Sequence, residues 1–224
     1  DDKIRRIFNI MDKAGIFDGT RQDIHSTNTK EQQQIAFEAA CESMVLLKNE
    51  RQVLPINTKR IKRIGVFGNL AMQPTIEGGG SSRVTPYYVS SPLEVLQQLC
   101  KDKAEVVYES GTFLAEDNPD QTLIEKMAKL AGKMDIALVF AGYPEYYETE
   151  GADRRNMDLP ADQVELINII ADANRNAVVV LQNGSPVNIS PWIDKVPGVV
   201  ESWYAGQESG SAIAAILMGN VNPS

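Results

Sequence analysis

Five continuous apolar runs, separated by stretches of helical periodicity, constrain the fold of this chain more than any other feature. The runs cover residues 61–67, 104–108, 136–141, 177–181 and 199–203. Continuous rather than alternating apolar residues are typical of parallel strands whose sheet is covered by helices on both faces. The pattern therefore predicts an α/β fold with a doubly wound, mostly parallel sheet.

Helices are expected before and between these runs, at the positions where apolar residues recur with helical spacing. A further short apolar run at residues 44–47 could add a strand. We expect residues 16–28, which are polar and rich in turn formers, to be a linker. The expected helices cover residues 3–14, 29–43, 92–101, 120–134, 161–174 and 209–218.

Glycines follow the predicted strands and mark the edge of the sheet at which a ligand is expected. They stand at positions 68, 111, 142, 184 and 206. Open α/β sheets bind ligands at the carboxyl ends of their parallel strands, where such loops gather. The loops that follow the strands are therefore the first places to look for functional side chains.

The charge and the scarce histidine exclude several classes of function. The chain of 224 residues has 22 Lys and Arg, 30 Asp and Glu, and a net charge of −8, which disfavours binding to nucleic acid or to an anionic membrane. Its two cysteines, Cys41 and Cys100, cannot form a disulfide framework. The only histidine, His25, lies in a polar stretch and is not expected to be catalytic. Acid–base chemistry is therefore expected from carboxylates, without a metal site.

The first candidate loop has three consecutive glycines and two serines, Gly78-Gly79-Gly80-Ser81-Ser82. Glycines allow a close backbone approach to a ligand and expose N–H donors. The loop fits a ligand-lining role and a plain surface connector about equally well. A phosphate cradle is disfavoured, because no Gly-Lys-Ser/Thr sequence follows.

The second candidate loop, residues 143–154, combines tyrosines with glutamates directly after a predicted strand. Aromatic rings pack against the CH faces of sugars, and carboxylates bind sugar hydroxyls. The alternative is a solvated acidic loop. Asp153 and Arg154 are expected to orient this loop through backbone contacts and ion pairs. Elsewhere, Trp192 and Trp203 are expected in the core, and Cys41 as a buried, inert thiol.

Several short motifs, taken in order and spacing, resemble one family. They are Ala39–Glu50 with Leu54-Pro55-Ile56, Ile64–Gly68, Gly78–Ser82, Glu150-Gly151-Ala152-Asp153-Arg154, Leu159-Pro160-x-x-Gln163, Gly184–Val187, Trp203–Glu208 and Gly219–Ser224. Together they resemble the C-terminal α/β-sandwich domain of glycoside hydrolase family 3. The resemblance implies a three-layer α/β/α sandwich with about six strands, one of them antiparallel.

The resemblance also implies a domain organisation. Residues 1–28 are expected to be the end of a preceding (β/α)8 barrel domain and a linker. Residues 29–224 are expected to be the sandwich domain, incomplete at its C-terminal end. The barrel would carry the nucleophilic aspartate and be the partner of this domain within one enzyme. The chain alone is therefore expected to be inactive.

The activity that the resemblance implies is a retaining, exo-acting β-glucosidase that acts on terminal β-linked glucosyl residues of glucosides or oligosaccharides. The family motif places the general acid/base at Glu150, with Glu148 as the second candidate. It places Gly79, Gly80, Ser81 and Ser82 on the leaving-group side of the substrate. No cofactor is expected, and a secreted or periplasmic location is favoured over a cytoplasmic one.

Three alternatives stay open from the sequence. The enzyme could be a β-xylosidase or another family 3 glycosidase. The domain could bind carbohydrate without taking part in catalysis. It could instead bind a nucleotide through the Gly78–Ser82 loop.

Overall fold

The computed structural model describes residues 1–18, 27–115 and 119–224, so His25 lies outside the described residues. The chain divides into two compact units, Asp1–Gln32 and Gln33–Ser224. The first unit contains helix α1 (Asp2–Lys13), within one residue of the predicted helix at each end. The apolar side chains Ile4, Ile7, Phe8 and Ile10 of α1 are all more than half exposed.

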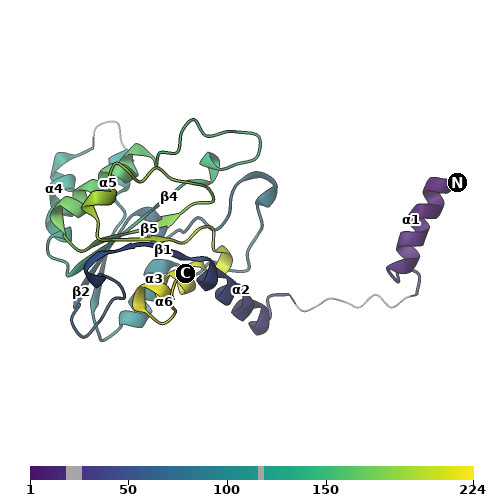
Figure 1. The fold of residues 1–224 in the computed structure, drawn as a ribbon, viewed down its shortest axis with the longest axis horizontal. Coiled ribbons are helices and arrows are strands. Elements are labelled where there is room, and N and C mark those ends of the chain that lie inside the picture. Colours follow the sequence, from purple (N-terminus) through teal and green to yellow (C-terminus); the bar gives the residue numbers. More distant parts are fainter. Residues whose placement is uncertain (19–26, 116–118) are drawn as a thin grey trace. The chain divides into compact units, whose positions relative to one another are not determined.

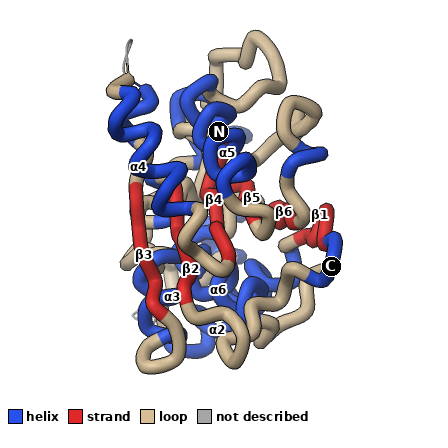
Figure 2. The backbone as a smooth tube through the Cα atoms, turned by 90° about the vertical axis from the view of Figure 1, so that its left-hand side faces the viewer, coloured by secondary structure: helices blue, strands red, loops and turns tan. Residues whose placement is uncertain are grey.

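The second unit is built on a six-stranded sheet in the order β1-β6-β5-β4-β2-β3 (Figures 1 and 2). All neighbouring strands are parallel except β1 and β6, which are antiparallel. The predicted sheet is thus confirmed, including its single antiparallel strand. The strands are β1 (Val45–Asn49), β2 (Arg63–Phe67), β3 (Glu105–Glu109), β4 (Ile136–Gly142), β5 (Ala177–Gln182) and β6 (Gly198–Glu201).

Helices cover both faces of the sheet and complete the three-layer sandwich (Figure 1). One face packs against α2 (Lys30–Ser43), α3 (Pro92–Cys100) and α6 (Ser209–Met218). The other face packs against α4 (Gln121–Ala131) and α5 (Ala161–Ala173). Each predicted helix of this unit is therefore present, with bounds that differ by three residues at most.

The two cores explain why the strands are apolar without alternation. In β4, Leu138 and Phe140 belong to the core under α3 and α6, whereas Val139 and Ala141 belong to the core under α4 and α5. Alternate side chains of a strand point to opposite faces, so a strand with two buried faces needs apolar residues throughout. Every residue of β4 and β5 is buried.

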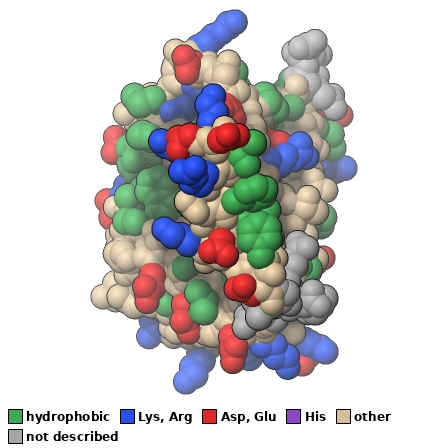
Figure 3. Space-filling view, turned by 90° about the vertical axis from the view of Figure 1, so that its right-hand side faces the viewer, with side chains coloured by type: hydrophobic (Ala, Val, Ile, Leu, Met, Phe, Trp, Pro, Cys, Tyr) green, Lys and Arg blue, Asp and Glu red, His purple; other side chains and the backbone are tan. Residues whose placement is uncertain are grey.

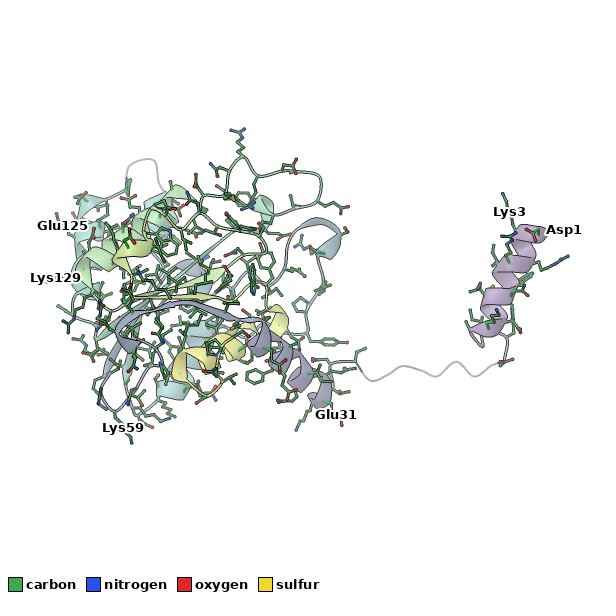
Figure 4. The ribbon with its side chains drawn as sticks, in the orientation of Figure 1. Asp1, Lys3, Glu31, Lys59, Glu125 and Lys129 are labelled. Carbon is green, nitrogen blue, oxygen red and sulfur yellow. The ribbon has the colours of Figure 1, made fainter. Side chains whose placement is uncertain are left out.

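Local signals explain where two of the helices begin. Pro92 stands at the start of α3, and the Ser91 side chain caps this helix by accepting from the Glu94 N–H. Asp120 caps α4, where its Oδ1 accepts from the Thr122 N–H at 2.8 Å. On the outer face of α4, Glu125 and Lys129 point away from the sheet (Figure 4).

Two expectations for the tryptophans have opposite outcomes. Trp192 lies in the core with 1% of its surface exposed, as predicted. The prediction for Trp203 is wrong, because 37% of its surface is exposed. Strand β6 ends at Glu201, and Trp203 has a left-handed backbone with φ of 55°. This turn takes the Trp203 side chain out of the core that a longer strand would have given it.

The burial predicted for Cys41 is confirmed. Cys41 is 2% exposed, and burial raises the pKa of its thiol, as expected for an inert buried cysteine. Both basic and acidic side chains are exposed in the view of Figure 3. Among the described residues, none of the helices has the length and apolar character needed to span a membrane.

Candidate active site

Two loops that the sequence marks separately meet at the carboxyl edge of the sheet. One follows β2 and contains Gly78–Ser82, and the other follows β4 and contains Glu148 and Glu150. The Gly79 N–H donates to the Glu148 carbonyl oxygen at 2.8 Å. The Ser81 N–H donates to Glu150 Oε2 at 3.1 Å, and the Ser81 hydroxyl also donates to Oε2.

The glycines allow this close approach. A Cβ atom added at Gly79 would lie 2.6 Å from Thr149 Oγ1. Gly80 has φ of +76°, and an added Cβ atom would lie 2.5 Å from the Cβ of Glu150. Residues other than glycine rarely have a backbone with this φ, and Cβ atoms do not come this close to non-bonded atoms in real structures. The loop is therefore fitted to the backbone around Glu150.

The same contacts disfavour a phosphate site. Two backbone N–H groups of the loop, those of Gly79 and Ser81, already donate to oxygens of Glu148 and Glu150. The Glu150 carboxylate stands where a phosphate would approach Ser81, and two like charges so close repel each other. The glycines allow this loop to pack against the acidic loop of the same chain rather than against a phosphate.

Glu150 is the more exposed of the two candidate carboxylates. The hydroxyl and then the N–H of Ser81 hold the pKa of the Glu150 carboxyl below its ordinary value, because both hydrogen bonds stabilise its charged form. A general acid needs its proton when it meets the substrate. In this chain, the surroundings of Glu150 thus favour the charged form.

Glu148 is half-buried and has three donors on the neighbouring loops. Its Oε2 accepts from the Gly184 N–H at 2.6 Å and from the Tyr204 hydroxyl, and its Oε1 accepts from the Ser185 hydroxyl. Burial first, and then the bond to Glu148, raise the pKa of the Tyr204 hydroxyl. Glu148 therefore ties its loop to the ends of β5 and β6.

Arg154 fixes the later part of the acidic loop. Its Nη1 donates to the Pro186 carbonyl oxygen at 3.2 Å, and its guanidinium lies 4.5 Å from the centre of the Tyr143 ring. Tyr143 stacks on Tyr147 with 5.8 Å between ring centres. These contacts agree with a loop-orienting role for Arg154, whereas Asp153 is exposed.

An open cavity of about 540 Å³ lies on the acidic loop. Tyrosines, arginines and the carboxylate of Asp153 supply its walls, a combination that suits a polar ligand with apolar faces. Its lining residues are Tyr146, Tyr147, Ala152, Asp153, Arg154, Arg155 and Asn156.

The remaining predicted side chain of the glycine loop faces its own backbone. Ser82 Oγ donates to the carbonyl oxygens of Gly78 and Gly79, at 2.8 and 3.1 Å. Arg83 forms an ion pair of 3.3 Å with Glu145 and so adds a second link between the two loops. Ser82 therefore shapes the loop, whereas Ser81 contacts Glu150.

Sequence reasoning marked Gly184 as a strand-end glycine but predicted no contact with Glu148 for Gly184, Ser185 or Tyr204, and no role for Glu201. All four follow or end β5 and β6, at the same edge of the sheet as the two candidate loops. The available signal is the polar Gln182-Asn183 and Glu201-Ser202 that end two apolar strands. Among the described residues, no three His, Cys, Asp or Glu side chains are grouped so that they could hold a metal ion.

Comparison with known proteins identifies the family of this chain. Residues 44–224 match the model of the glycosyl hydrolase family 3 C-terminal domain. The chain belongs to glycoside hydrolase family 3. Its six-stranded α/β sandwich is the C-terminal domain fold of that family, as the sequence motifs predict.

Family 3 relatives of several specificities are similar to the chain. It is 45% identical over 190 residues to thermostable beta-glucosidase B of Acetivibrio thermocellus, covering 85% of this chain and 25% of the relative. It is 30% identical over 233 residues to a beta-xylosidase of Formosa agariphila, covering 100% of this chain and 32% of the relative. The chain thus spans about a quarter to a third of the length of these relatives.

A solved family 3 structure has the same fold. The beta-glucosidase of Bifidobacterium adolescentis superposes with a TM-score of 0.79 and 37% identity, covering 91% of this chain and 29% of that structure. The likeness extends over the sheet that carries the candidate site.

Proposed function

We propose that this chain is the acid/base-bearing domain of a retaining, exo-acting β-glucosidase. The nucleophile would lie on a (β/α)8 barrel domain outside this chain, and the substrates would be glucosides or oligosaccharides with a terminal β-linked glucose. The observation that carries the proposal is the Glu150 carboxylate, exposed at the carboxyl edge of the sheet and held by Ser81. The names of the similar beta-glucosidases support the sugar.

In this proposal, Glu150 acts twice. While the nucleophile attacks the anomeric carbon, protonated Glu150 donates its proton to the departing glycosidic oxygen. The Glu150 carboxylate then takes a proton from the water that hydrolyses the glycosyl-enzyme intermediate. Ser81 orients the carboxylate through Oε2, and Glu148 holds the loop that carries it.

The domain organisation is part of the same proposal. Residues 1–28 would be the end of the barrel domain and a linker, and residues 29–224 the sandwich domain. Contact with the barrel would remove water from Glu150 and place the nucleophile's negative charge near it. Both effects raise a carboxyl pKa and oppose the effect of Ser81. The chain alone lacks them, so the purified chain should not hydrolyse an aryl β-glucoside.

Substitution of Glu150 in the full-length enzyme tests the acid/base role. Glu150→Ala should slow hydrolysis of a substrate with a poor leaving group, such as cellobiose, by about 100-fold or more, the range that general acid catalysis contributes. It should slow formation of the glycosyl-enzyme from 2,4-dinitrophenyl β-glucoside far less, since that leaving group needs no proton. Equal losses on both substrates would contradict the proposal.

Two variants in the same loop separate the alternatives. Glu145→Ala removes a carboxylate whose ion pair with Arg83 is exposed to solvent on both sides and therefore weak. It should keep the wild-type ratio between the two substrates. Glu148→Ala distinguishes the second candidate: a stronger dependence on the leaving group than in Glu150→Ala would move the acid/base role to Glu148. Full activity of Glu150→Ala would indicate a domain that only binds carbohydrate.

The similar beta-xylosidase makes xylose the second candidate sugar. Comparison of kcat/KM for aryl β-glucosides and aryl β-xylosides decides between them. A preference for the glucoside supports the proposal, and a preference for the xyloside replaces glucose by xylose without changing the role of Glu150.

A further inference from the structure

Glu201 is a buried carboxyl group at the end of β6 that the mechanism above does not use. Its residue is 5% exposed. Its Oε1 accepts from the Trp203 N–H at 3.0 Å, and its Oε2 accepts from Asn183 Nδ2 at 3.1 Å. A buried carboxyl group is costly unless such partners satisfy it, so its position calls for an explanation.

Both partners of Glu201 stand next to the donors of Glu148. Asn183 precedes Gly184 and Ser185, which donate to Glu148. Asn183 Nδ2 also donates to the Ser185 carbonyl oxygen at 2.9 Å, which closes that turn. On the other side, Trp203 precedes Tyr204, the third donor to Glu148. Glu201 therefore fixes both chain segments that hold Glu148.

The backbone of Trp203 shows why this segment needs support. Its φ of 55° lies in the left-handed region, which is unfavourable for a bulky residue and persists only where neighbouring contacts enforce it. The Glu201 carboxylate enforces it by accepting the Trp203 N–H. This turn points the next residue, Tyr204, toward Glu148.

Gly184, Tyr204 and Glu148 are closely packed, so a small movement of one of them would displace the others. A Cβ atom at Gly184 would lie 2.7 Å from the Tyr204 ring and 3.2 Å from Glu148 Oε2. Glu148 continues directly into Thr149 and Glu150, and its carbonyl oxygen accepts the Gly79 N–H of the other loop. A shift of Glu148 would therefore move both loops that surround Glu150.

We infer that Glu201 is a positioning residue for the acid/base loop, acting through Asn183, Trp203 and Glu148. The inference rests on the proposed function, because it assigns Glu201 to the placement of Glu150. The charged and polar groups that face Glu201 are the Glu148 carboxylate, Asn183 and the N–H groups of Ser202 and Trp203. Burial and then Glu148 oppose its charge, so loss of a partner would leave the group poorly satisfied.

The test compares two leaving groups in the full-length enzyme. Glu201→Gln keeps the size of the side chain but places an N–H donor against the Asn183 donor. We expect kcat for cellobiose to fall about 10-fold while KM changes less than 2-fold. Formation of the glycosyl-enzyme from 2,4-dinitrophenyl β-glucoside should change less than 2-fold. Equal losses on both substrates, or no loss on either, would overturn the inference.

A milder variant keeps the test decisive if Glu201→Gln fails to fold. Tyr204→Phe removes one hydroxyl donor of Glu148 and leaves the ring in place. We expect the same selective loss on cellobiose, and an unchanged ratio would overturn the inference. If Glu150→Ala shows a strong dependence on the leaving group but Glu201→Gln and Tyr204→Phe do not, only the positioning role fails. If Glu150→Ala shows none, the proposed function itself fails.

Discussion

Ser81 donates its backbone N–H to Glu150 Oε2 across 3.1 Å, and 69 residues of sequence separate the two. The pair joins the glycine loop after β2 to the acidic loop after β4. Because β2 and β4 are parallel neighbours, their carboxyl ends meet at one edge of the sheet. The hydrogen bond is a direct consequence of the topology and orients the proposed acid/base.

Removal of the Ser81 hydroxyl should move the pH profile of the full-length enzyme. The hydroxyl is the largest contribution that lowers the pKa of Glu150. The first step needs protonated Glu150, so kcat/KM falls as the pH rises through this pKa. Ser81→Ala raises the pKa, and the alkaline limb of kcat/KM for cellobiose should shift to higher pH.

Ser82→Ala is the matched control for this shift. Ser82 Oγ donates to the carbonyl oxygens of Gly78 and Gly79, within the same loop, and not to Glu150. In Ser82→Ala, the alkaline limb of kcat/KM for cellobiose should lie at the same pH as in the wild type. A shift to lower pH in Ser81→Ala, or equal shifts in both variants, would contradict the assignment.

A methyl group at Gly80 should displace Glu150. In Gly80→Ala, the added Cβ atom would lie 2.5 Å from the Cβ of Glu150 at a φ of +76°. A displacement of about 1 Å can cost roughly 100-fold in rate. We expect kcat for cellobiose to fall by about that factor in the full-length enzyme.

Gly206→Ala separates this displacement from backbone strain. Gly206 has φ of +64°, and an added Cβ atom would meet nothing within 4 Å. The left-handed backbone should cost both variants about 1 kcal/mol of unfolding free energy. The close contact with Glu150 should add to the loss in Gly80→Ala. Only Gly80→Ala should lose most of its activity, and equal activities would show that Gly80 does not set the position of Glu150.

The sandwich could be predicted because its signals are local. The apolar runs of β4 and β5 have no polar face, which indicates burial on both sides. Trp203 was misplaced because its apolar neighbours extend the pattern of β6, whereas a hydrogen bond to Glu201 turns the backbone away from the strand. This hydrogen bond is local, because the two residues are only two positions apart, but apolar periodicity carries no signal for a side chain that turns the backbone.

The candidate site could be predicted only in part. Gly79, Gly80, Ser81, Glu148 and Glu150 were marked by their loops, and the structure brings them together. The donors of Glu148 could not be predicted, since Ser185 lies 37 residues and Tyr204 56 residues away along the chain. Their meeting depends on the order of β4, β5 and β6 in the sheet.

The buried Glu201 should make the stability of this chain fall with pH. Burial is the largest cause that raises its pKa from 4.5 to about 7 in the folded chain. Folding therefore favours the protonated carboxyl group, and this contribution to the unfolding free energy is fully present below pH 4.5 and is lost as the pH rises through 7. Between these pH values the unfolding free energy of the wild type should fall by about 3 kcal/mol relative to that of Glu201→Gln. Urea unfolding at several pH values measures both.

Glu125→Gln provides the comparison for this titration. Glu125 is exposed on the outer face of α4 and points away from the sheet (Figure 4). Its variant should keep the wild-type dependence of stability on pH. If Glu201→Gln keeps the same dependence as well, the Glu201 carboxyl does not titrate in this range.

The most direct test of the acid/base role is the product that Glu150→Ala forms with azide in the full-length enzyme. Azide fits the space left by the carboxylate and attacks the glycosyl-enzyme without needing a base. With 2,4-dinitrophenyl β-glucoside, azide should therefore accelerate turnover and yield β-glucosyl azide, identified by NMR. Absence of this product from Glu150→Ala, or its formation by Glu148→Ala instead, would contradict the assignment of Glu150.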